Sequence, residues 1–70
     1  MQLVTDNLDL QIRRRRLGLT QRDIGRELGI RRLADISDFE NGHREALPNG
    51  RTRADYEALL DRLESERGAA

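Results

Sequence analysis

The glycines at positions 18, 29 and 42 constrain the fold of this chain more than any other feature. They leave two windows that are each just long enough for a short helix, and glycine is the residue that most often ends a helix. The first window opens with Thr20, and Asp23 follows three residues later, a pattern typical of a capped helix N-terminus. The middle of the chain is therefore predicted to be a helix, a sharp turn at Gly29 and a second helix.

One further helix is expected before this pair and one after it. The first begins after Thr5 or Asp6 and ends near residue 17, and the last covers about 53–66 with Thr52 as its cap. In each predicted helix, buried positions recur at intervals of three or four residues. The expected inward faces are Leu10, Arg14 and Leu17; Ile24 and Leu28; Leu33, Ile36 and Phe39 or Glu40; and Tyr56, Leu59, Leu60 and Leu63. No alternating pattern predicts a strand, so the expected fold class is all-α.

Charge is unevenly distributed, although the formal net charge is zero. Residues 1–34 hold eight Arg and four acids, whereas residues 35–70 hold five Arg and nine acids. The half that contains the first of the paired helices and the start of the second is thus basic, as in a nucleic-acid binder. All thirteen cations are Arg, which suits bidentate contacts to phosphate and guanine, although a GC-rich genome gives the same bias.

The paired helices resemble the Xre family of helix-turn-helix proteins, the lambda-repressor-like domains, over about residues 10–44. The matching segments are Gly-Leu-Thr-Gln at 18–21, Ile-Gly at 24–25, Leu-Gly at 28–29 and Ile-Ser-Asp-Phe-Glu-Asn-Gly at 36–42. One residue more than the family's usual spacing precedes the last segment. The resemblance implies one domain over residues 1–70, a lambda-repressor-like helix-turn-helix fold of four to five short helices. It implies a sequence-specific regulator of transcription that binds double-stranded DNA, as a repressor or autoregulator. A cytoplasmic location is expected because the sequence shows no membrane span or signal peptide.

The third helix is expected to begin at Arg31 or Arg32 and to enter the DNA major groove. Both arginines are placed either to bind guanine O6 and N7 or only to contact phosphate. Ser37 is expected to bind a phosphate or a base. Asp35 and Asp38 are expected to accept from a cytosine amino group or to orient a neighbouring Arg, unless one of them only faces solvent.

The two ends of the motif are expected at the DNA backbone. The resemblance implies that Gln21 contacts a phosphate, and the free N–H groups beside Thr20 at a helix N-terminus bind anions. The alternative is that Thr20 only caps the helix and Gln21 only faces solvent. The resemblance also implies that the loop after the third helix lies along the backbone, where its expected contacts are Asn41, His43 and Arg44; the alternative for His43 is a simple surface residue.

Arg14 shares the inner face of the first helix with two leucines, and a buried charge needs a partner. The resemblance implies that this partner is Glu40, at the end of the third helix. We expect a homodimer on an inverted-repeat operator, because so short a chain buries little surface alone. Its interface is predicted to include Leu60 and Leu63 of the last helix.

The chain offers no constellation for catalysis, since it has one His and no Cys. No metal site, cofactor motif or membrane span is expected either. Two other functions stay open. One is an antitoxin-like module that binds a partner protein through its acidic last helix, and the other is a binder of nucleic acid without sequence preference.

Overall fold

The computed structural model describes residues 7–68, and within this range it holds four α-helices and no strand. The helices are α1 (Leu8–Arg16), α2 (Gln21–Leu28), α3 (Leu33–Glu40) and α4 (Arg53–Gly68). This confirms the predicted all-α class. The predicted start of the first helix, after Thr5 or Asp6, lies outside the described residues.

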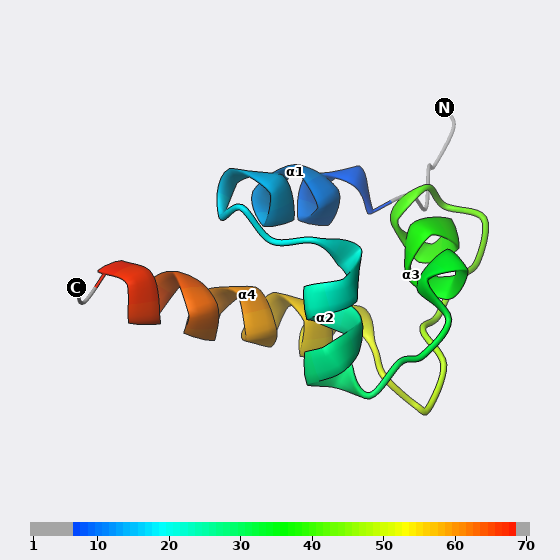
Figure 1. Ribbon diagram of the computed structural model, residues 1–70. Helices are drawn as coiled ribbons and strands as arrows, with labels where there is room; N and C mark the ends of the chain where they lie inside the picture. The colour runs from blue at the N-terminus through cyan, green and yellow to red at the C-terminus, as the bar shows by residue number, and fades with distance from the viewer. Residues whose placement is uncertain (1–6, 69–70) are drawn as a thin grey trace.

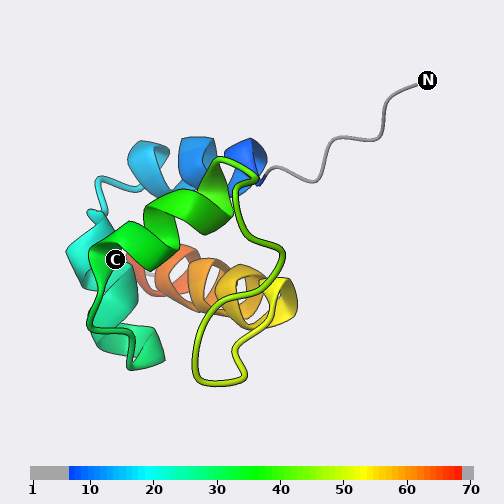
Figure 2. The same cartoon turned by 90° about the vertical axis from the view of Figure 1, so that its right-hand side faces the viewer.

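The four helices pack around one core. α1 and α4 run side by side, α2 crosses near the start of α4, and α3 covers one end of the molecule (Figure 1). Each of α1 and α2 contacts both α3 and α4. Turned by 90°, the same molecule presents α3 to the viewer, with α2 beside its first turn and the 43–52 loop on its other side (Figure 2). This arrangement leaves the outer face of α3 open.

α2 has the predicted cap at each end. The Thr20 hydroxyl accepts from the Asp23 backbone N–H at 3.1 Å, and the Asp23 carboxylate accepts from the Thr20 N–H at 2.9 Å. Gly29 follows the helix with φ +73°, the left-handed conformation that favours glycine. The turn between α2 and α3 is therefore fixed by local chemistry on both sides of α2.

Gly25 lies where α2 meets the α2–α3 turn and the first half of α3. A Cβ at this position would lie 2.6 Å from the Ile30 carbonyl oxygen and 3.3 Å from Ile36 Cδ1. The backbone of the α2–α3 turn therefore passes so close to α2 here that a side chain larger than glycine would not fit without a shift. Glycine costs the helix about 1 kcal/mol of intrinsic propensity relative to Ala at this position, and it permits the close approach of the Ile30 carbonyl in the turn.

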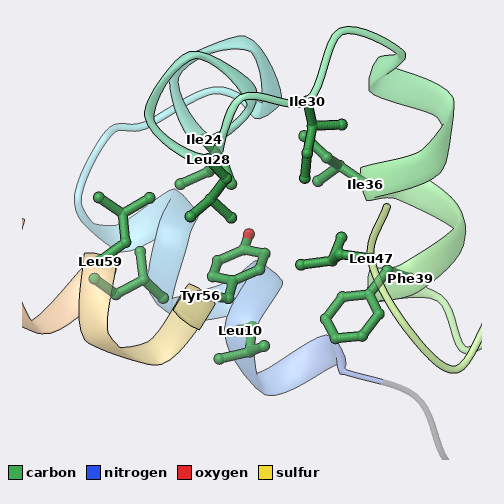
Figure 3. Packing of buried hydrophobic residues seen from close by; sticks show 10 residues of the cluster. Leu10, Ile24, Leu28, Ile30, Ile36, Phe39, Leu47, Tyr56 and Leu59 are labelled. Carbon is green, nitrogen blue, oxygen red and sulfur yellow. The ribbon is translucent and has the colours of Figure 1, made fainter. Parts of the chain in front are cut away.

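The core surrounds Tyr56, whose side chain is fully buried (Figure 3). Leu47, from the loop between α3 and α4, also reaches this core and was not predicted to be buried. The expected inward faces of the helices are present. The buried apolar residues are Leu10, Ile24, Leu28, Ile30, Ile36, Phe39, Leu47, Tyr56, Leu59 and Leu60.

The burial of Leu60 contradicts part of the predicted dimer interface. Its side chain has no exposed surface, because the core of a single chain takes it up together with Tyr56 and Leu59. Leu63 is half-buried and packs against the same cluster. The prediction of Leu60 as an interface residue is wrong, and little of the apolar stripe of α4 remains for a partner.

None of the helices in residues 7–68 is long and apolar enough to cross a membrane.

Candidate nucleic-acid interface

Arg31 and Arg32 lie in the turn before α3 rather than in its first turn. Arg32 occupies the N-cap position with extended backbone angles, and its side chain makes no cap bond. Both arginines are exposed, and neither has a carboxylate partner within residues 7–68. They line an open pocket of about 400 Å³ together with Gly29, Ile30, Asp35, Pro48 and Asn49. Two free guanidinium groups thus stand at the exposed end of α3.

Asp35 binds Arg44, so two of the predicted contact residues neutralise each other. Arg44 Nη1 lies 2.9 Å from Asp35 Oδ1, and Arg44 Nε donates to the Ala46 carbonyl at 2.6 Å. Asp35 keeps only 16% of its side-chain surface exposed. Of the roles predicted for Asp35, that of orienting a neighbouring Arg is the one observed. Arg44 presents less free charge than the sequence suggested.

The end of α3 is held by short-range bonds. Asn41 Nδ2 donates to the Ser37 carbonyl at 2.9 Å, and the His43 backbone N–H donates to the Asp38 carbonyl at 2.7 Å. His43 Nδ1 lies 3.9 Å from Asp38 Oδ1, with both side chains largely exposed. Gly42, between them, has φ +82°. These four predicted residues therefore lie together at one end of α3, with polar groups open to solvent.

Gln21 is tied to the core as well as exposed to the surface. Its Nε2 donates to Glu40 Oε1 at 3.2 Å, which leaves the amide oxygen and one further N–H without a partner among the described residues. The side chain also lines an open pocket of about 580 Å³ at the N-terminus of α2, with Arg14, Arg15, Leu19, Thr20, Arg22 and Leu33. Arg15 and Arg22 were not predicted as part of the site. Their positions on either side of the Gly-Leu-Thr-Gln segment are the signal that would have identified them.

Glu40 and Arg14 form the predicted buried ion pair. Arg14 Nε donates to Glu40 Oε2 at 2.9 Å and Arg14 Nη2 to Oε1 at 3.2 Å. The same carboxylate accepts from Gln11 at 3.3 Å and from the Tyr56 hydroxyl of α4. The Tyr56 contact was not predicted, since tyrosine was expected only to fill the core.

The pKa values of this cluster follow from its burial and its donors. Burial alone would raise the pKa of the Glu40 carboxyl, but hydrogen bonds from Arg14, Tyr56 and Gln21 outweigh it and lower the pKa below its ordinary value. Burial raises the pKa of the Tyr56 hydroxyl, and its bond to the Glu40 carboxylate raises it further. Glu40 is thus held as a carboxylate and Tyr56 as a neutral donor.

Ion pairs elsewhere consume most of the acidic charge. Three arginines each bind two carboxylates: Arg13 those of Asp61 and Glu64, Arg53 those of Asp9 and Glu57, and Arg62 those of Glu27 and Glu66. Seven arginines have no carboxylate within 4.0 Å in the described part of the chain. They are Arg15, Arg16, Arg22, Arg31, Arg32, Arg51 and Arg67.

Four of these free arginines adjoin the α2–α3 pair. Arg15 and Arg22 line the same pocket as Leu33, the first residue of α3, and Arg31 and Arg32 directly precede Leu33. We call Arg15, Arg22, Arg31 and Arg32 the basic surface. The uneven charge of the sequence thus becomes a concentration of unpaired positive charge beside α2 and α3.

The long loop before α4 is anchored to the α2–α3 turn. Asn49 Nδ2 donates to the Gly29 carbonyl at 2.7 Å, and Arg51 Nε donates to the Leu28 carbonyl at 3.0 Å. These bonds satisfy carbonyl groups at the C-terminus of α2, which have no partner within the helix. The loop therefore braces the turn that carries Arg31 and Arg32, a role that its turn-forming residues did not reveal.

Comparisons of the chain with protein-family models, with curated proteins and with solved structures found no match. Within residues 7–68 no group of three or more His, Cys, Asp or Glu side chains is placed to hold a metal ion. The surface around α2 and α3 presents charged and hydrogen-bonding groups that are open to solvent.

Proposed function

We propose that this protein is a lambda-repressor-like helix-turn-helix domain that binds double-stranded DNA in a sequence-specific manner and regulates transcription. The observation that carries the proposal is the basic surface. The four arginines of this surface have no carboxylate partner within residues 7–68, and they surround the start of α2 and of α3. A chain of zero formal charge that pairs its acids elsewhere and leaves this region positive has the electrostatic footprint of a nucleic-acid binder.

The geometry of α2 and α3 supports the groove assignment. α2 is capped at Thr20, turns at Gly29 and is followed by α3, whose outer face is open (Figure 2). In this proposal α3 enters the major groove, with Arg31 and Arg32 at the base edges. Gln21 and Arg22 then lie at a phosphate, beside the N–H groups at the start of α2.

The proposed operator is an inverted repeat that two copies of the chain bind, and the proposed activity is repression or autoregulation. A twofold pair of domains requires two half-sites separated by about one DNA turn. The antitoxin-like alternative receives less support, because Asp61, Glu64, Glu57 and Glu66 of the acidic α4 already bind arginines of this chain. The binding experiment described next also tests this alternative.

A salt series of binding tests the proposal. The preferred duplex is first selected from a random library, and fluorescence anisotropy then compares it with a random duplex between low and moderate salt. A sequence-specific regulator binds its site about 10³-fold or more tighter than random DNA. A steep salt dependence without that ratio would identify a non-specific binder. Failure to bind either duplex would overturn the proposal and favour a protein partner.

A further inference from the structure

The largest exposed apolar side chains of the described residues lie next to each other on α1. Leu8 is 39% and Ile12 is 53% exposed, whereas the other large hydrophobic residues in this part of the chain are buried or half-buried. The two are four residues apart and share one face of α1, opposite the buried Leu10. Exposed hydrophobic residues that lie together, rather than scattered, are typical of an interaction surface.

The charges on α1 indicate which partner fits this face. Asp9 lies in the first turn, and Arg15 and Arg16 in the last turn have no carboxylate partner in the described chain. Asp9 binds Arg53 but keeps 63% of its side-chain surface exposed, so its carboxylate can accept from another donor. The helix dipole has the same polarity, with its negative end at the arginines. The face is thus negative at one end, apolar in the middle and positive at the other.

Such a face is complementary to itself when two copies run antiparallel. Rotation about a twofold axis near Ile12 places the last turn of one helix against the first turn of the other. Arg16 then opposes Asp9 of the second copy twice, and the two Ile12 side chains meet at the centre. A parallel pair would instead bring the free arginines of both copies together, which like-charge repulsion opposes.

We propose that the Leu8–Ile12 face of α1 binds a second copy of this chain in an antiparallel helix pair, and that it forms the homodimer interface in place of the buried Leu60. The inference rests on the proposed function, which includes a homodimer, and it specifies which surface forms the dimer interface. The apolar contact is small. Stable interfaces bury about 1,200 Å² or more in total, so the expected dissociation constant lies between about 10 μM and about 1 mM.

Cysteine cross-linking tests the twofold contact directly, because the chain has no Cys of its own. An Ile12→Cys variant places one thiol at the proposed axis, and Ser65→Cys places one at an exposed position on α4 as the matched control. Under mild oxidation at about 100 μM protein, a concentration within the expected range of dissociation constants, Ile12→Cys should form a covalent dimer at least tenfold faster than Ser65→Cys. Equal rates for the two variants would overturn the proposal.

Sedimentation equilibrium up to about 1 mM protein, the weak limit of the expected range, provides the second test. Ile12→Asp should weaken self-association at least tenfold, whereas Ala58→Asp, at an exposed site on α4, should leave it unchanged. Circular dichroism checks that both variants remain folded. A wild type that stays monomeric, or a dimer that is indifferent to Ile12→Asp, would contradict the assignment.

Binding to a half-site duplex separates this inference from the proposed function. A single chain covers a half-site, so Ile12→Asp should bind the half-site as tightly as wild type and lose only the gain in affinity on the full inverted repeat. If no duplex is bound at all while the wild type still dimerises through Ile12, DNA binding fails and the interface stands. If the half-site is bound but Ile12→Asp has no effect on the full site, the interface fails and DNA binding stands.

Discussion

Arg14 Nε donates to Glu40 Oε2 at 2.9 Å inside the core, and this bond joins α1 to the end of α3. Glu40 is completely buried and Arg14 nearly so. Every oxygen of the carboxylate is used, since Gln11, Gln21 and Tyr56 also donate to it. One side chain thus connects α1, α2, α3 and α4.

Removal of either partner of this pair should destabilise the protein strongly. Arg14→Ala or Glu40→Ala leaves a buried charge without compensation, and the expected loss is about 3–5 kcal/mol of unfolding free energy. A double-mutant cycle measured by urea unfolding should show marked coupling. The exposed pair Arg62–Glu27 is the matched control, with an expected coupling of about 0–1 kcal/mol. Additive effects of Arg14→Ala and Glu40→Ala would be evidence against a shared network.

Tyr56 should remain protonated at alkaline pH while the protein is folded. Burial and the bond to Glu40 raise its pKa, so the native state holds the proton more tightly than the unfolded state. This contribution to stability is complete below the unfolded pKa of about 10, and it is lost as the pH rises through the folded value. Tyr56 is the only tyrosine and the chain has no tryptophan, so phenolate absorbance reports this group alone.

The measurement is a spectrophotometric titration with and without urea. In urea the phenolate should appear with a midpoint near pH ~10. Without urea it should appear only at higher pH, together with the loss of helical circular dichroism. Ionisation near pH ~10, the ordinary tyrosine value, with the helices intact would show that the hydroxyl is not bound to Glu40.

Gly25→Ala should destabilise the domain although alanine is the better helix former. The added methyl would lie 2.6 Å from the Ile30 carbonyl oxygen, a backbone atom that cannot rotate away. The expected loss is about 1–3 kcal/mol, the usual cost of overpacking. Gly68→Ala is the control, because a Cβ there would have no atom of the described residues outside its own helix turn and chain neighbours within 4 Å. Thermal unfolding of both variants measures the difference, and a Gly25→Ala variant as stable as wild type would refute the close contact.

The free arginines should divide between specificity and affinity. We expect Arg31→Ala or Arg32→Ala to cost about 1–3 kcal/mol on the preferred duplex and to relax the preference at one base pair. Arg22→Ala should weaken binding to all duplexes alike and reduce the salt slope by about one. Arg62→Ala, on α4 and paired with Glu27, is the control and should change neither. An unchanged specificity ratio in both Arg31→Ala and Arg32→Ala would remove these residues from base recognition.

Local sequence chemistry predicted much of the fold. The capping residues Thr20 and Asp23 and the glycine at 29 define α2 without reference to the rest of the chain. Periodicity identified the inward faces of the helices, and the unpaired charge of Arg14 indicated a buried partner. These features depend on residues that are close in sequence or on a charge that burial makes costly.

The wrong prediction for Leu60 and the contacts that were not predicted concern choices that only tertiary packing makes. The apolar stripe of α4 does not indicate how many of its side chains the core of one chain buries, and Leu60 is buried there completely. The pairing of Asp35 with Arg44 depends on the path of a loop that no periodic pattern describes. The same holds for Asn49, whose amide donates to the Gly29 carbonyl across 20 residues of sequence.

The ion pairs of α4 also have a consequence for the behaviour of the molecule on a charged resin. Arg13 binds two carboxylates of α4, and Arg62 binds one of α4 and one of α2, so that negative charge is masked. The basic surface has no such partner in the described part of the chain. At pH 7 the formal charges sum to zero, yet adsorption depends on the face that meets the resin rather than on the sum. The folded protein should therefore be retained by a cation exchanger at neutral pH.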